Sequence, residues 1–172
     1  MNIFKRLFGN IDDRAPVRPL YAAITTAARR PHWYIEGGVA DTVEGRFEMV
    51  TALLVVVLVR LEALGAAGAD ASVLLTEVFV EDMDGQLRES GIGDVSIGKY
   101  VGKLMSALGG RLGAYRESLG GNAPFGDALV RNLYAGVSPA AGALAHVEAR
   151  LRGVAQDVKA RPLEYLLAGE PM

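Results

Sequence analysis

The chain has 172 residues, the length of one ordinary domain, and 51% of them are hydrophobic. The net charge of −2 argues against direct nucleic-acid binding, which needs a dominant basic surface. The absence of Cys excludes disulfides, Cys-ligated zinc, iron–sulfur clusters and thiol catalysis.

Residues 1–16 form a basic amphipathic segment ahead of the predicted helical domain, 17–168. Its apolar and basic side chains are those of a segment that lies at a membrane surface: Phe4, Lys5, Arg6, Leu7 and Phe8. The alternatives are docking on the protein's own surface, or disorder. No continuous apolar region follows, so we expect no secretory signal. The pattern of a folded domain begins by about Pro19, which leaves little room for a mitochondrial presequence.

Proline and glycine divide the remaining chain into helical segments. No stretch alternates apolar and polar residues for long enough to suggest a β-sheet. Asp41, Asp94 and Ser138 have the character of N-caps. The predicted helices cover about 17–30, 42–64, 71–89, 95–119, 125–134 and 138–160, with a last short turn at 162–167. The predicted fold class is therefore all-α, a single-domain bundle of about six helices around a central apolar helix, about 42–64.

The central helix holds the longest apolar run, from Met49 to Val59, interrupted only by Thr51. As a helix this run rises about 16 Å, roughly half of a bilayer core. Charged residues close it on both sides. We therefore interpret it as a buried core helix, with a transmembrane span as the weaker alternative.

The candidate catalytic and metal-binding groups do not form an established pattern. His32 and His146 are the only histidines, and neither has the spacing of a di-iron or zinc motif. The glycines at 91–94 lack the lysine of a phosphate loop and a preceding strand. Ser138 lacks the second glycine of a nucleophile elbow and begins a helix. The sequence therefore predicts no catalytic residue, no cofactor and no metal ligand, and the protein is expected not to be an enzyme.

One charged stripe stands out on the third predicted helix. At 100° per residue, Glu77, Glu81, Asp84 and Arg88 fall on one narrow face. Such a stripe is either a solvated surface or a docking site for a basic partner.

Two further charges face apolar surface on their helical wheels, Arg46 on the second helix and Asp82 on the third. A carboxylate on an apolar face needs a partner. We therefore predict an ion pair between Arg46 and Asp82. Arg111 and Arg131 are rival partners for Asp82, and extension of Arg46 into solvent is the alternative.

Several blocks of the sequence resemble the ubiquinol–cytochrome c chaperone family. The resemblance runs from about Leu20 to Tyr134, and its most specific stretch lies between Glu81 and Asp94. The middle of the second helix lacks a histidine that the family pattern leads us to expect, and the chain beyond Ser138 has no recognisable match. The similar blocks are Leu20-Tyr21, Ala28-Arg29, Trp33-Tyr34, residues 41–47, 79–84, 87–89 and 91–94, Gly110-Arg111, Ala114-Tyr115 and residues 131–134.

The resemblance implies a non-enzymatic assembly chaperone that binds cytochrome b, or another component of complex III, during biogenesis of the ubiquinol–cytochrome c reductase. Mitochondrial members act with a small partner near the ribosome, so a small co-chaperone is a second expected partner. Without a presequence this would be a bacterial member, working in the cytoplasm or at the cytoplasmic face of the inner membrane, with peripheral membrane contact. The rival hypotheses are a generic helical adaptor or scaffold, and an enzyme with an acidic helical pocket.

Overall fold

The computed structural model describes residues 12–89 and 94–172, and within these ranges every regular element is helical. The predicted all-α class is therefore confirmed. A short 3₁₀ helix comes first and eight α-helices follow: η1 Ala15–Val17, α2 Arg18–Ala28, α3 His32–Ile35, α4 Val43–Ala63, α5 Ala66–Glu89, α6 Asp94–Leu119, α7 Phe125–Asn132, α8 Ala141–Ala160 and α9 Leu163–Leu167.

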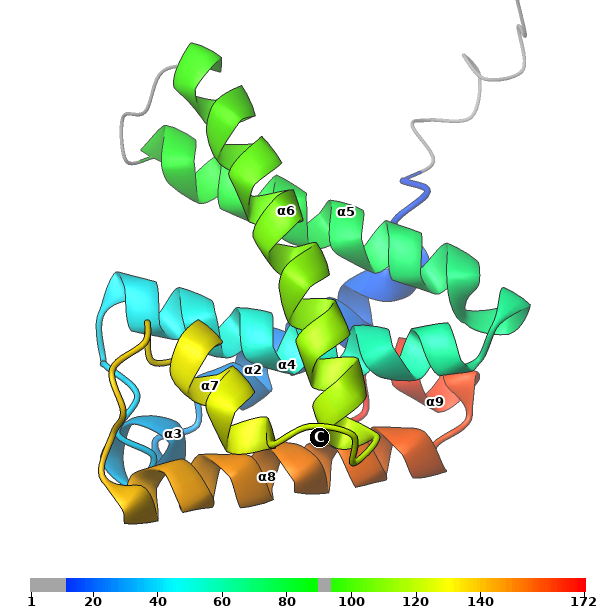
Figure 1. The fold of residues 1–172 in the computed structure, drawn as a ribbon. Coiled ribbons are helices and arrows are strands. Elements are labelled where there is room, and N and C mark those ends of the chain that lie inside the picture. The colour runs from blue at the N-terminus through cyan, green and yellow to red at the C-terminus, as the bar shows by residue number, and fades with distance from the viewer. Residues whose placement is uncertain (1–11, 90–93) are drawn as a thin grey trace, which may run out of the picture.

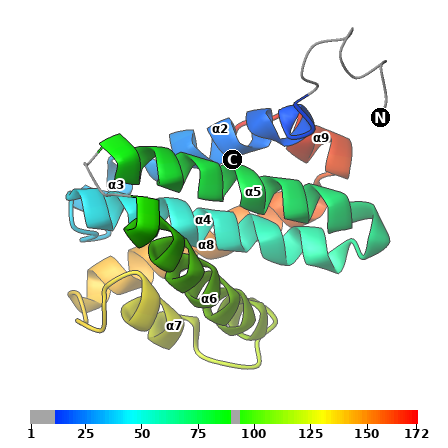
Figure 2. The same cartoon turned by 90° about the horizontal axis from the view of Figure 1, so that it is seen from above.

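Helix α4 is the centre of the bundle, as its apolar composition predicts. It contacts α2, α5, α6 and α8, which surround it (Figures 1 and 2). Its side chains from Thr51 to Leu58 are all buried, because neighbouring helices cover it on several sides. No helix among the described residues is long and apolar enough to cross a membrane.

The start of α4 differs by one residue from the prediction. Thr42, and not Asp41, is the N-cap, and its Oγ1 accepts a hydrogen bond from the backbone N–H of Gly45 at 3.1 Å. Thr42 has the extended backbone that a capping residue needs. A Cβ on Gly45 would collide with the carbonyl oxygen of Ala40, so this first turn requires glycine.

Three other boundaries move for local reasons. Helix α5 begins five residues earlier than predicted, directly after Gly65, whose positive φ ends α4 as expected. Helix α8 begins at Ala141, because extended backbone continues through Ala140, and Ser138 is therefore not its cap. Helix α6 begins at Asp94 and runs unbroken through its glycines. The Asp94 side chain is not among those that the structure describes, so its predicted role as a cap stays a prediction.

The one-turn helix α3 lies in the segment 31–40 that was predicted as a loop. Its Trp33 is buried, and the indole Nε1 donates to the carbonyl oxygen of Ala27 at 2.8 Å. Beside it, His32 Nδ1 lies 3.1 Å from His146 Nε2 of α8. The only two histidines of the chain therefore share one hydrogen bond and join α3 to α8.

This histidine pair predicts a pH effect on stability. Burial, His146 and nearby arginines lower the pKa of His32 below its usual 6.5. The folded state therefore binds a proton more weakly than the unfolded state, so stability is complete above about pH 6.5 and falls as the pH drops below it. We expect a smaller loss of stability between pH 7 and pH 5.5 in His32→Gln than in wild type, measured by urea unfolding. Equal losses would show that the pair does not contribute.

Candidate functional site: the groove between α5 and α6

Helices α5 and α6 cross, and the N-terminal part of α6 extends beyond the other helices with the end of α5 beside it (Figure 1). A groove of about 550 Å³ lies between them, which we call the acidic groove. It contains three residues of the predicted partner-binding stripe. Its lining residues are Arg14, Thr76, Glu77, Val80, Glu81, Asp84, Val101 and Met105.

The acidic side of the groove is an ion-pair network. Arg14 lies 3.2 Å from Glu81 and 3.7 Å from Glu77, and Arg18 lies 3.1 Å from Glu81. These side chains are about half-exposed, so each pair contributes at most about 1 kcal/mol. The carboxylates are therefore partly neutralised by the start of the chain's own helical domain.

The far end of the stripe is paired within α5. Arg88 Nε lies 2.8 Å from Asp84 Oδ2, an i,i+4 pair on the helix surface. The structure thus brings all four stripe residues to one face of α5, and Arg14, Arg18 and Arg88 partly offset the charge of its three carboxylates. The predicted role of the stripe in partner binding stays a prediction.

Sequence reasoning missed Arg14 and Arg18, although a signal was present. They are four residues apart at the start of the domain, the same spacing as Glu77 and Glu81. Arg14 directly precedes η1 and Arg18 begins α2, so the equal spacing belongs to two segments of opposite charge that pack against each other. The sequence did not indicate that these segments, more than 60 residues apart in the chain, would meet.

The opposite wall of the groove is apolar and open. Met105 of α6 lines this wall and is 41% exposed. Val80 and Val101 are partly buried and continue this surface across the groove. Exposed large apolar side chains that lie together with charged ones at the edge are typical of surfaces that bind other proteins.

The predicted ion pair between Arg46 and Asp82 is wrong. The Arg46 side chain is 61% exposed, and its Nε lies 2.7 Å from Asp41 Oδ1 in the loop before α4. Asp82 instead accepts a hydrogen bond of 2.7 Å from the phenolic hydroxyl of Tyr21 on α2. Burial, reinforced by this carboxylate, raises the pKa of Tyr21, so the phenol stays neutral and donates.

Among the ion pairs of the described residues, the best-buried one joins Glu48 of α4 to Arg111 of α6. Arg111 Nη1 lies 2.7 Å from Glu48 Oε2, and Nη2 donates to Oε1 at 2.9 Å. The side chains are only 14% and 23% exposed. Burial raises the pKa of Glu48, and the guanidinium of Arg111 opposes this shift. Arg111 therefore pairs with Glu48 of α4 and is not a partner of Asp82.

Among the described residues, no group of three or more His, Asp or Glu side chains could hold a metal ion. The fold and the groove thus define an all-helical domain with an open surface that is apolar on one wall and charged on the other.

Comparisons with known proteins place this domain in a family. Residues 36–172 match the ubiquinol–cytochrome c chaperone family. The crystal structure of the Cbp3 homolog from Brucella abortus has a TM-score of 0.78 to this structure and 30% sequence identity. The likeness covers 92% of this chain and 88% of that one. No protein with a curated description matches. The chain belongs to the ubiquinol–cytochrome c chaperone family, as the sequence blocks predicted. The match starts later than these blocks and, contrary to the expectation for the chain beyond Ser138, continues to residue 172.

Proposed function

We propose that this protein is a non-enzymatic assembly chaperone that binds cytochrome b during biogenesis of the ubiquinol–cytochrome c reductase. The observation that carries the proposal is the family match, which extends over most of the chain, together with the likeness to the Cbp3 homolog. A small co-chaperone is a second expected partner. The likeness to a Brucella abortus protein supports a bacterial member. Its expected place of work is the cytoplasm or the cytoplasmic face of the inner membrane.

We propose the acidic groove as the surface that holds the client. Its exposed apolar wall suits the apolar segments of a membrane protein before they enter the bilayer. Its acidic wall suits the Lys and Arg residues that flank such segments on the cytoplasmic side. Glu77, Glu81, Asp84 and Arg88 then steer the client, while the apolar wall supplies most of the affinity.

Reversing two charges tests this proposal. In Glu81→Lys/Asp84→Lys, we expect slower capture of newly made cytochrome b and a weaker dependence of capture on salt, because charges at the edge of an interface mainly affect association. The measurement is pull-down of pulse-labelled cytochrome b with the tagged chaperone at several salt concentrations.

Asp127→Lys/Glu164→Lys is the matched control. It makes the same change in net charge, at exposed acids on α7 and α9. Its capture should equal that of wild type. Unchanged capture by the groove variant would show that the stripe is only solvated surface.

The N-terminal segment supports a second proposal, peripheral contact with the membrane. The residues that motivate it lie outside the described part of the chain, and their basic and apolar composition is what favours a membrane surface: Phe4, Lys5, Arg6, Leu7 and Phe8. Deleting residues 1–9 should reduce flotation with anionic liposomes and leave the helical circular dichroism unchanged. Equal flotation of the full-length and truncated proteins would reject this role.

A further inference from the structure

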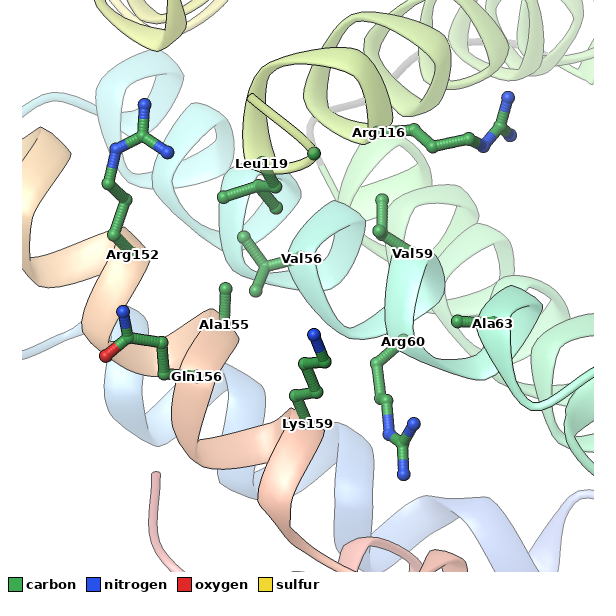
Figure 3. A pocket seen from close by; sticks show the side chains of 11 residues that line it. Val56, Val59, Arg60, Ala63, Arg116, Leu119, Arg152, Ala155, Gln156 and Lys159 are labelled. Atoms are coloured by element: carbon green, nitrogen blue, oxygen red, sulfur yellow. The ribbon is translucent and has the colours of Figure 1, made fainter. Parts of the chain in front are cut away.

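A second pocket lies on another part of the bundle, where α4, the end of α6 and α8 meet (Figure 3). Its volume is about 460 Å³, within the range of small-molecule sites. The floor is apolar and formed by small or branched side chains: Val56, Val59, Ala63, Leu119 and Ala155. A pocket of this kind accepts the body of an apolar molecule.

The charged lining of this pocket is of one sign. Four cationic side chains and no carboxylate line it: Arg60, Arg116, Arg152 and Lys159. Two of these cations are already engaged. Arg116 binds Glu62 through both carboxylate oxygens, at 2.8 and 3.1 Å, and Arg152 binds Glu148 at 2.9 Å. In Figure 3 the guanidinium groups of both arginines point away from the centre of the pocket.

The other two cations lack a carboxylate. Arg60 donates from Nη2 to the carbonyl oxygen of Arg161 at 3.3 Å, and its buried Nε has no hydrogen-bond partner among the described residues. Lys159 forms no ion pair with a residue that the structure describes. Its ammonium group points back toward Val56 and Val59, over the apolar floor (Figure 3). In the same view the Arg60 guanidinium points away from the floor, on the side of its bond to Arg161, so Lys159 is the cation that an anion in the pocket would meet.

We propose that this pocket binds a free fatty acid of medium chain length, with the chain on the apolar floor and the carboxylate at Lys159. The charge of the lining excludes a cationic ligand, and the small apolar floor disfavours a fully polar anion such as a nucleotide. This site lies apart from the acidic groove and does not depend on cytochrome b binding.

Decanoate is the probe, used with the full chain below its micelle-forming concentration and followed by titration calorimetry. We expect saturable binding, and Lys159→Gln should weaken it roughly tenfold or more. Neutral decan-1-ol should bind more weakly than decanoate and be unaffected by Lys159→Gln. Ala155→Trp, which fills the floor, should abolish both. Lys103→Gln, at an exposed lysine on α6, is the matched control and should behave as wild type.

Four results would overturn the proposal: no binding of decanoate, equal affinity for decanoate and decan-1-ol, affinity unchanged in Lys159→Gln, or association only with phosphatidylglycerol vesicles. The last would indicate attraction to a charged surface in place of a pocket. If Ala155→Trp does not fold, the comparison of Lys159→Gln with Lys103→Gln still shows whether decanoate binding depends on Lys159.

Discussion

Replacing Arg111 by methionine is expected to destabilise the fold by about 2–3 kcal/mol, because it leaves the Glu48 carboxylate largely buried without its partner. The value is set below that for a fully buried pair, because both side chains keep some contact with water. Chemical unfolding measures it as a lower midpoint with an unchanged denaturant slope.

The double variant Glu48→Met/Arg111→Met removes both charges and so measures the net contribution of the ion pair to stability. Burial outweighs the guanidinium in setting the raised pKa of Glu48, so the pair contributes little net stability. Removing both charges should therefore restore most of the loss. Arg116→Met is the matched control, since it breaks the exposed pair with Glu62 and should cost no more than about 1 kcal/mol. Equal losses in Arg111→Met and Arg116→Met would contradict this account.

Placing a carboxylate on the apolar wall of the acidic groove should have the largest effect on function. We expect Met105→Glu to reduce capture of cytochrome b at least about tenfold, because a charge at the centre of an apolar contact must be desolvated when the client binds. The fold should survive, since Met105 is 41% exposed. Capture is measured by pull-down of pulse-labelled cytochrome b.

Val73→Glu is the control for Met105→Glu. Val73 is an exposed apolar residue near the other end of α5, outside the groove. The Val73→Glu variant should capture cytochrome b as well as the wild-type protein does. A similar loss in both variants would point to a general effect of surface charge and not to the groove.

The central helix α4 could be predicted from the sequence, because a run of apolar residues this long is stable only when it is buried. Most helix ends could be predicted from the positions of Pro and Gly. Helix α3 could not, because four residues are too few for a periodic pattern and Pro31 suggested a loop. Its stability comes from burial of Trp33 and not from local sequence.

The ion pairs were harder to predict than the helices. A helical wheel shows which side chains of one helix point in the same direction. It does not show which neighbouring helix covers each face. Arg46 has Asp41 within reach in its own preceding loop, and this local pair forms instead of the distant one. On the helical wheel of α4, Glu48 lies opposite Arg46 and the apolar side, where contact with solvent would be expected, yet α6 packs there and supplies Arg111.

Site-specific photocrosslinking can decide whether the acidic groove holds newly made cytochrome b. A benzoylphenylalanine at position 105, in the groove, is compared with one at position 73, outside it, in full-length protein expressed with tagged cytochrome b. We expect a crosslink to cytochrome b from position 105 and none from position 73. Crosslinking from position 73 alone, or from neither position while cytochrome b is still captured, would contradict this expectation.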